Sequence, residues 1–424
     1  MATFTGTAAN DTADAGAGVL IGFTGGSLAE LMNSDGDVFF ALAETDAIVA
    51  GSGNDLLRGG LGADVLDGGA GSDTVDYLDN FGAVFVNLDI GQGFGNAAQG
   101  DTYANIENAT GSIYNDFIIG NAGANVLDGS QGNDYLIGSL GADTLIGGTG
   151  LDIASYEENA GAIFINMRTG LGYGNAAQGD TYSGIEGIVG TSYDDYIISA
   201  SSPIFLYTEP PQVRAFVNGG AGNDYVISGD GADDLVGGAG EDTVSFELGV
   251  GINASLATGR AFENDPRSSL PQLIQANADT LSGFENLVGS QGRDALYGDD
   301  NDNVLFGKLG SDYLFGAEGR DIFVFDTALG AFDPNIDRIG DFTEYDFIYL
   351  DRGTVYTALP FGQLSADAFT VGTAATTADQ RIVYDQASGN LFYDPDGSGA
   401  TAQMQFATLM GSPDLMPSEI FVSG

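Results

Sequence analysis

The chain has 424 residues, of which 60 are acidic and 11 basic, so its formal net charge is −49. It has no histidine and no cysteine, which excludes imidazole bases, Ser-His-Asp triads, zinc sites built on His or Cys, disulfides and thiol nucleophiles. The few basic residues are scattered, so we do not expect nucleic-acid binding. No apolar stretch is long enough to span a membrane, so we do not expect a membrane span. The hydrophobic fraction of 43% predicts a chain that folds once cations neutralise its negative charge.

Residues 1–50 contain one copy of a motif that recurs later, followed by an apolar stretch. The copy is GTAANDTAD from Gly6, which puts Asp11 at its sixth position, and Gly18–Ala50 then reads as an apolar insertion. We expect this segment to be either a cap over the open end of a repeat array or a surface that docks onto another subunit. The start of the chain lacks the pattern of a cleaved signal peptide, so we expect export by another route.

Residues 51–325 follow a nine-residue period, which indicates a repeat architecture. The nonapeptides have the form Gly-Gly-x-Gly-x-Asp-x-U-x, where U is a large apolar residue, and they occur in four runs. The sixth positions of the runs are Asp55, Asp64 and Asp73; Asp116, Asn125, Asp134, Asp143 and Asp152; Asp195, Asp224, Asp233 and Asp242; and Asp294, Asn303, Asp312 and Asp321.

A longer period of 79 residues is superimposed on these runs. The segment GNAAQGDTY occurs at Gly95–Tyr103 and again at Gly174–Tyr182. The linkers AVFVNL (Ala83–Leu88) and AIFINM (Ala162–Met167) alternate in side-chain character, which predicts strands. After each linker comes an Ile-Glu or Phe-Glu pair, so the recurring acids are either further ligands or part of an exposed strand face: Glu107, Glu186 and Glu285.

The composition of the nonapeptide favours a bound metal ion. Its glycines permit a tight turn, and its last three residues predict a short strand whose middle side chain points to one face. Two nonapeptides then form one coil, and stacked coils place aspartates in rows about 4.8 Å apart, where they repel each other. Calcium would relieve this repulsion, because it accepts about six to eight oxygen ligands in flexible geometry, from carboxylates and from the carbonyls of the turns.

These nonapeptides resemble the RTX (haemolysin-type calcium-binding) repeats. The resemblance extends from Gly6 to Val324, counting the linkers, and implies an all-β fold: a right-handed parallel β-roll, or β-solenoid, that folds around multiple Ca²⁺ ions. It implies that the sixth-position residues are the calcium ligands, with weaker or incomplete sites at Asn125 and Asn303. For Asp11, which stands alone, a plain turn and a calcium ligand both remain open.

Residues 326–424 contain no nonapeptides, and we expect a separate C-terminal β-rich secretion unit. Two antiparallel strands are predicted at Arg381–Asp385 and Asn390–Asp394, around an Ala-Ser-Gly turn. The acidic and then apolar end of the chain resembles the C-terminal signal of type I-secreted RTX proteins. Asp394 and Asp396 resemble the start of an EF-hand loop, but the twelfth position is Gln405 and not Glu, so a calcium site and a plain turn both remain open.

The repeats and the C-terminal unit leave no segment for a catalytic domain, so we expect a secreted, extracellular or cell-surface protein that is not an enzyme. The leading interpretation is a surface-layer, filament or biofilm-matrix protein that self-assembles when external calcium folds it. Its expected partners are calcium, further copies of the chain and the type I secretion machinery. The alternatives are a calcium buffer, a polysaccharide-modifying enzyme that uses carboxylates, and an adhesin or matrix protein that binds a surface polysaccharide through aromatic rings: Phe85, Phe94, Tyr103, Phe164, Tyr173 and Tyr182.

Overall fold

The computed structural model describes residues 2–6, 11–14, 19–21, 23, 36–199, 214–229, 231–263, 278–329, 335–353 and 355–424. In these ranges the chain forms short β-strands and four single-turn 3-10 helices, Asn96–Ala98, Asn175–Ala177, Ala366–Ala368 and Pro417–Glu419. None of the helices described has the length and hydropathy of a bilayer-spanning segment. The chain divides into two compact units, which we call unit 1 (Met1–Ile197 and Phe216–Gly220) and unit 2 (Ile198–Ala215 and Ala221–Gly424).

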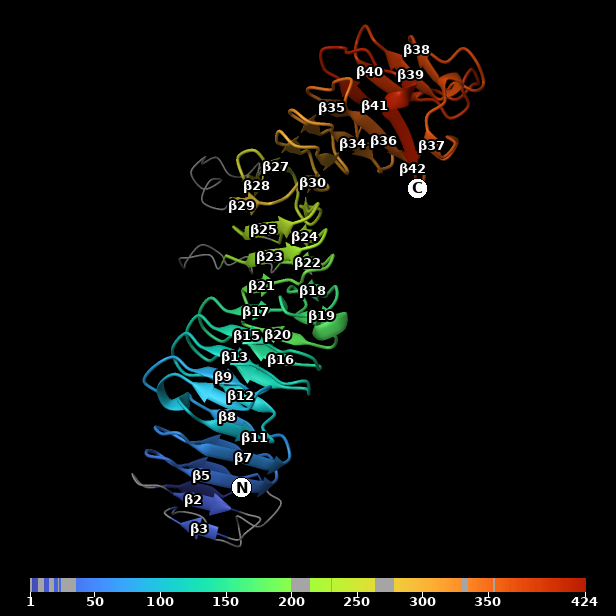
Figure 1. The fold of residues 1–424 in the computed structure, drawn as a ribbon. Coiled ribbons are helices and arrows are strands. Elements are labelled where there is room, and N and C mark those ends of the chain that lie inside the picture. The colour runs from blue at the N-terminus through green and yellow to red at the C-terminus, as the bar shows by residue number, and fades with distance from the viewer. Residues whose placement is uncertain are drawn as a thin grey trace. The chain divides into compact units, whose positions relative to one another are not determined.

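Unit 1 is built from two sheets, and successive strands of the runs alternate between them (Figure 1). Most neighbouring strands are parallel, so each coil adds one strand to each sheet. The first sheet contains β1 (Thr3–Thr5), β4 (Val38–Phe40), β6 (Leu56–Arg58), β8 (Thr74–Asp76), β12 (Asn108–Thr110), β14 (Val126–Asp128), β16 (Thr144–Ile146), β18 (Phe164–Asn166), β19 (Leu171–Tyr173), β20 (Thr181–Ser183) and β22 (Tyr196–Ile198). The second contains β2 (Thr12–Asp14), β3 (Val19–Ile21), β5 (Ala47–Ser52), β7 (Val65–Ala70), β9 (Phe85–Asn87), β10 (Gln92–Phe94), β11 (Thr102–Ala104), β13 (Phe117–Ile119), β15 (Tyr135–Ile137), β17 (Ile153–Ser155), β21 (Gly187–Val189) and β23 (Phe216–Ala221).

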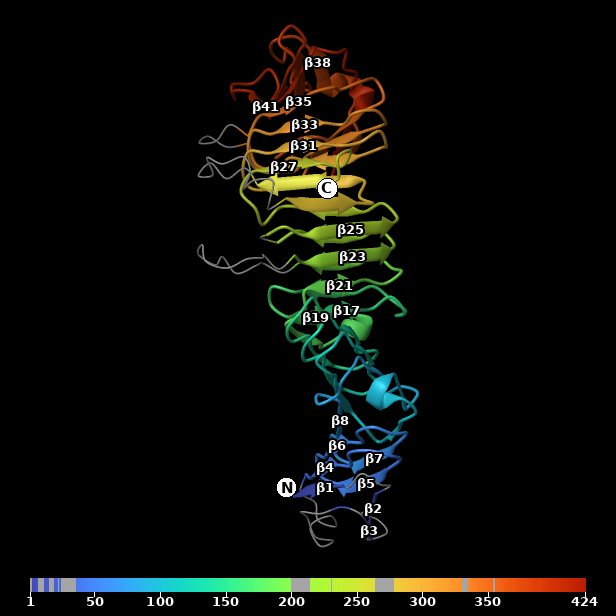
Figure 2. The ribbon, with the colours of Figure 1, turned by 90° about the vertical axis from the view of Figure 1, so that its left-hand side faces the viewer.

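Unit 2 repeats this arrangement and ends in antiparallel strands. Its second sheet shows the stacking clearly in Figure 2, where β25, β27, β31, β33 and β35 lie one above another. The first sheet of this unit contains β24 (Tyr225–Ile227), β26 (Thr243–Ser245), β30 (Asn286–Val288), β32 (Val304–Phe306), β34 (Ile322–Phe325), β36 (Phe347–Asp351), β37 (Gly362–Gln363) and β42 (Ile420–Ser423). The second contains β25 (Asp234–Ala239), β27 (Ile252–Ser255), β28 (Arg260–Glu263), β29 (Asp279–Ser282), β31 (Ala295–Tyr297), β33 (Tyr313–Phe315), β35 (Asp337–Ile339), β38 (Phe369–Val371), β39 (Ile382–Asp385), β40 (Asn390–Tyr393) and β41 (Met404–Leu409).

The core of each unit is a thin layer between the two sheets. A strand side chain alternates between faces with a period of two, and most of the three-residue strands bury their middle residue. Each middle residue stacks on its counterpart one coil away, as Leu127 does on Leu145 and Leu136 on Ile118. These four side chains are fully buried. The predicted all-β fold with parallel stacked coils is therefore confirmed.

Three hairpins interrupt the regular coils, and we call these segments junctions. At the first junction, β9 pairs in parallel with β13 of the next coil, and β10 runs back antiparallel to β9. The chain then returns to the earlier coil, where β11 pairs with β10 and, in parallel, with β7. The second junction is β18–β20 and the third is β27–β29. The strands predicted at Ala83–Leu88 and Ala162–Met167 are β9 and β18.

The regular coils extend beyond the boundaries drawn from the sequence. They begin before residue 51, because β4 and β5 already pair in parallel with β6 and β7. They continue past residue 325, because β35 and β36 pair in parallel with β33 and β34. Residues 24–35 of the predicted apolar insertion lie outside the described residues. The predicted C-terminal hairpin is present as β39 and β40.

Candidate metal sites

The sixth-position residues predicted from the nonapeptides all lie at the same point of a coil, immediately before a strand. Although they are charged or polar, none of them exposes more than 3% of its surface. Asp11 belongs to the same rows, because its backbone N–H donates to the Oδ1 of Asp46, which precedes the neighbouring strand. Carboxylates are almost never buried without partners, so the contacts of these groups determine what the rows can bind.

One oxygen of each carboxylate links its coil to the preceding one. The N–H of Asp55 donates to Oδ1 of Asp73 over 2.7 Å, and the N–H of Asp116 and of Asp134 donate to Oδ1 of the aspartates that follow 18 residues later, over 2.7 and 2.8 Å. The same bond recurs in unit 2 between Asp294 and Asp312 over 2.8 Å. The aspartates therefore form two hydrogen-bonded rows in each unit, one beside each sheet.

The three recurring glutamates take the sixth position in coils that lack an aspartate there. The N–H of Asp73 donates to Oε2 of Glu107 over 2.8 Å. Glu186 accepts in the same way from Asp152 over 3.0 Å, and Glu285 from Asp242 over 2.8 Å. The three glutamates therefore lie in the carboxylate rows, and their role as calcium ligands stays a prediction.

Sequence reasoning missed seven further members of the rows, which are Asp37, Asp46, Asp101, Asp180, Asp279, Asp337 and Asp346. Two signals were present. Asp37 and Asp46 continue the nine-residue spacing upstream of Asp55, and Asp101 and Asp180 are the acids of the repeated GNAAQGDTY segment. The degenerate glycine pattern around these residues hides the nonapeptide.

In many of the aspartates of the rows, the second carboxylate oxygen is buried and accepts no hydrogen bond from the described residues. This holds for Oδ2 of Asp46, Asp55, Asp64, Asp73, Asp134, Asp143, Asp152, Asp312 and Asp321. An ionised oxygen in this state costs several kcal/mol unless a cation lies beside it. We therefore expect cations beside these oxygens, which recur at intervals of nine residues.

The turns supply the other oxygens that a cation would need. Gly150 has φ of +147°, and a Cβ built on it would overlap the carbonyl oxygen of Gly132 in the turn one coil earlier. The turns therefore stack backbone on backbone, with carbonyl oxygens between them. Within the described ranges no three acidic side chains converge on one point, so an ion there would combine one or two carboxylates with carbonyls, a set of hard oxygen ligands that suits calcium.

Burial raises the pKa of these carboxyls when no ion is bound. It brings the pKa of Asp134 to about 8, with the charges of Asp116 and Asp152 adding to the rise, and it brings Asp143 and Asp321 to a pKa of about 7. Without a cation, these groups hold protons at a pH where an ordinary aspartate is ionised.

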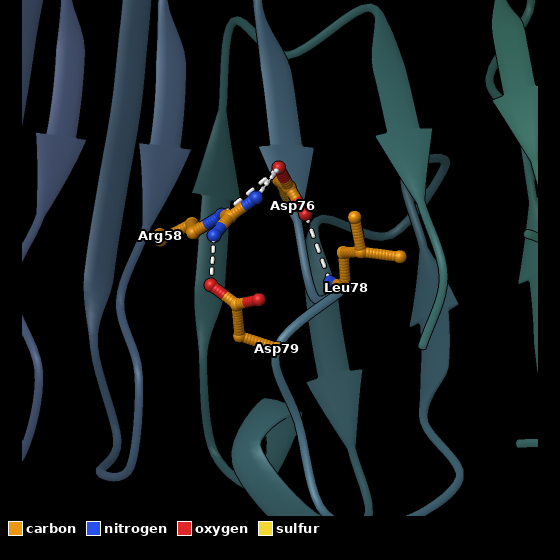
Figure 3. Close-up of polar contacts among 4 residues, drawn as sticks. All are labelled: Arg58, Asp76, Leu78 and Asp79. Carbon is orange, nitrogen blue, oxygen red and sulfur yellow. Dashed lines mark hydrogen bonds and ion pairs between the residues drawn. The ribbon is translucent and has the colours of Figure 1, made fainter. Parts of the chain in front are cut away.

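Basic side chains on the outer faces pair with acids that do not belong to the rows. Arg58 donates from Nε and Nη2 to Oδ2 of Asp76, over 2.9 and 2.7 Å, and from Nη1 to Asp79 (Figure 3). Oδ1 of Asp76 accepts from the N–H of Leu78 over 2.8 Å. This arginine thus links β6 to β8 and the turn after it. Within the described ranges it does not pair with a carboxylate of the buried rows.

The C-terminal EF-hand-like segment closes on itself. Oδ2 of Asp396 accepts from the hydroxyl of Thr401 over 2.8 Å, and Oδ1 of Asp394 accepts from the N–H of Asp396 over 3.2 Å. Gln405, at the twelfth position, donates instead to Asn390 and Thr408 over 2.9 and 3.0 Å. Calcium at Asp394 and Asp396 stays a prediction.

Comparison with known proteins agrees with the geometry. The family model for the RTX calcium-binding nonapeptide repeat (4 copies) matches residues 40–75, 110–145, 119–154, 216–244, 279–314 and 297–326. No curated protein matches the chain in sequence. Among solved structures, the crystal structure of the extracellular lipase LipA from Serratia marcescens matches with 16% identity and a TM-score of 0.16. That match covers 74% of this chain and 40% of the lipase, so the chain spans less than half of the lipase's length.

Proposed function

We propose that this chain, which carries RTX calcium-binding nonapeptide repeats, is a secreted extracellular or cell-surface protein that external calcium folds. The observation that carries the proposal is a series of buried carboxylate oxygens that accept no hydrogen bond within the described ranges, for example at Asp64, Asp143 and Asp321. Calcium binding at such oxygens is coupled to folding, because the sites exist only when the coils are stacked.

The run aspartates would hold the ions, and the ions would supply positive charge between adjacent coils. The chain itself provides the oxygens, the hydrogen bonds that orient each carboxylate, and the turns that exclude larger groups. Release through the type I secretion machinery would suit such a protein, because a chain that folds only on meeting calcium can be exported unfolded. The proposal includes no catalytic step.

We further propose that the folded protein self-associates into a surface layer, filament or biofilm matrix. In unit 1 the first sheet ends at β1 and the second at β3, whose Ile21 is 60% exposed. The backbone groups of an edge strand can pair with another chain, and contact between unlike ends builds open arrays. Calcium would also remove part of the repulsion between copies that each carry a net charge of −49.

A role as a carbohydrate-binding matrix protein is the second candidate, and outward rows of aromatic rings favour it. In unit 1, Phe85 lies between Phe94 and Phe117, with ring centroids 5.3 and 5.0 Å apart, and Phe164 lies 5.6 Å from Tyr173. Two of the rings expected on this surface are not available there. Tyr103 is buried, and the hydroxyl of Tyr182 forms a hydrogen bond with the hydroxyl of the buried Tyr156.

The test combines folding with assembly. Circular dichroism of the full chain should show disorder in a chelator and β-structure at calcium concentrations of about 10⁻⁴–10⁻³ M; a folded chain in chelator would contradict the calcium proposal. Electron microscopy of the calcium-loaded protein should then show filaments or lattices. Monomers at high concentration would contradict assembly, and reproducible binding to a glycan array would favour the carbohydrate role.

A further inference from the structure

The carboxylates at the junctions differ from those in the runs in what their second oxygen contacts. At the first junction, Oδ2 of Asp101 accepts a 2.6 Å bond from the hydroxyl of Tyr77, which also lies 2.6 Å from the hydroxyl of Tyr103. Both tyrosines and the aspartate are buried. The second junction repeats this group 79 residues later, with Tyr156 donating to Asp180 over 2.6 Å.

The third junction keeps a hydroxyl donor although it has lost both tyrosines. Phe246 and Leu281 stand where the other junctions have tyrosine. Asp279 takes the sixth position, and its Oδ2 accepts from the hydroxyl of Ser228 over 3.0 Å instead. Ser228 thus supplies to Oδ2 of Asp279 the hydroxyl donor that a tyrosine supplies at the first two junctions.

The carboxylate that restarts the coils after each junction also has a hydroxyl partner, four residues earlier in the chain. Ser112 donates its hydroxyl to Asp116 over 2.9 Å, Thr191 to Asp195 over 3.0 Å, and Ser290 to Asp294 over 2.7 Å. The N–H of each of these donors bonds the other oxygen of the same aspartate, over 2.5 to 2.6 Å. Both oxygens of each are therefore occupied by protein donors.

The two asparagines of the rows provide a third form of the same arrangement. The side-chain amide of Asn125 donates to the carbonyl oxygen of Glu107 over 2.6 Å, and that of Asn303 donates to the carbonyl of Glu285 over 2.9 Å. Here an N–H group of the side chain contacts the backbone of the preceding coil directly. At the corresponding place in the runs lies a carboxylate oxygen without a partner.

We infer that protein donors take the place of calcium at the junctions, so that calcium ions occupy the runs and leave the junction carboxylates unligated. This inference rests on the proposed calcium binding. A buried carboxylate oxygen needs a hydrogen-bond donor or a cation, and at the junctions that need is already met. The tyrosine, serine, threonine and asparagine side chains then hold neighbouring coils together by hydrogen bonds that need no calcium, whereas the coils on either side depend on calcium.

The experiment counts bound calcium per chain, by elemental analysis of full-length protein freed of unbound ions, and follows thermal unfolding of the same samples. Ser112→Ala and Tyr77→Phe remove one junction donor each. Asp134→Asn, in the run that begins at the same junction, is the matched control. We expect the two junction variants to keep the wild-type ion count or gain an ion while unfolding at a lower temperature, and Asp134→Asn to lose at least one ion.

Loss of an ion from Ser112→Ala or Tyr77→Phe would overturn the inference, because the altered group would then support a calcium site. If Ser112→Ala does not fold, Thr191→Ala and Tyr156→Phe give the same comparison at the second junction, where the conservative Thr191→Ser should keep the wild-type ion count and stability. A wild-type chain that binds no calcium would instead contradict the proposed function itself.

Discussion

Asn125 and Asp143 occupy the sixth position of successive coils and differ in one side-chain atom. The N–H of Asn125 donates to Oδ1 of Asp143, as it would from an aspartate. The remaining atom decides the chemistry: Nδ2 of Asn125 donates to a backbone carbonyl, whereas Oδ2 of Asp143 accepts nothing from the described residues. At this scale a metal site is created or removed by exchanging a donor for an acceptor.

Replacing Asn125 by aspartate should therefore create a calcium site. Asn125→Asp keeps the shape of the side chain but turns its donor into a second buried acceptor, and we expect at least one additional ion per chain in the same calcium count. Without calcium, the variant should be less stable than wild type, because two oxygens then face each other. Asn133→Asp, on the exposed part of a neighbouring turn, adds the same charge and should leave the ion count unchanged. An unchanged count for Asn125→Asp would contradict the prediction.

The raised carboxyl pKa values predict that the calcium-free fold is most stable at acid pH. Without calcium, the folded state holds protons on Asp134 up to a pKa of about 8 and on Asp143 and Asp321 up to about 7, whereas the unfolded chain loses them near pH 4. The stability that these groups give the calcium-free fold is present below about pH 4 and is lost as pH rises toward 7 or 8. Calcium binds the ionised form, so its affinity should rise over the same range.

Circular dichroism of the chelator-treated chain across a pH series measures this directly. We expect β-structure near pH 4 and its loss as the pH rises toward 8. β-structure that persists without calcium at pH 8 would contradict the prediction.

At the scale of the strand, most of the short strands in the runs contribute their middle side chain to the core. A three-residue strand is too short to be stable alone, so its stability comes from the middle residue stacked between two coils. Leu136 on β15 lies between Ile118 on β13 and Ala154 on β17, and is fully buried. The hairpins at the junctions follow the same rule, since β9 continues the second sheet of unit 1 through Val86 beside Ile118.

Leu136→Ala should accordingly cost about 2–5 kcal/mol in the calcium-loaded protein, because it leaves a cavity in a core that is one side chain thick. Denaturant unfolding in excess calcium measures the change. Leu140, in the following turn, is 57% exposed, and Leu140→Ala should change stability by about 0.5 kcal/mol or less. Equal effects of the two variants would mean that the strand core does not determine stability.

At the scale of the whole molecule, charge and fold are coupled. The chain carries a formal net charge of −49, and the described structure places many of its carboxylates in buried rows, where salt in the solvent screens them poorly. We therefore expect neutralisation to come from ions bound inside the rows, so that folding depends on calcium rather than on ionic strength.

Removal of calcium with a chelator should abolish most β-structure in circular dichroism, and sodium chloride at about 1 M should not restore it, because it screens exposed charges only. Magnesium at the concentration at which calcium folds the chain should be much less effective, since it demands a tight octahedral set of ligands. Full recovery in sodium chloride or magnesium would show that general screening, and not the geometry of the rows, controls folding.

The sequence alone determined the repeat, the strands and most members of the carboxylate rows. A nine-residue period with glycine before each aspartate specifies a local conformation, because turn, strand and burial of the middle residue are all decided within one nonapeptide. Asp55, Asp64 and Asp73 could be identified for this reason, and so could the strands of the linkers. The spacing also contained Asp37 and Asp46, where weaker glycine signals concealed it.

Only the tertiary structure decided which of these carboxylates has an oxygen available for calcium. Asp116 and Asp134 share the same motif position, yet Ser112 occupies the oxygens of the first and no described residue contacts Oδ2 of the second. The partners of Asp101, Tyr77 and Tyr103, meet only because a hairpin folds back one coil. The contact between Tyr77 and Asp101 joins residues 24 positions apart, so no local pattern reports it, whereas Ser112 lies only four residues before Asp116.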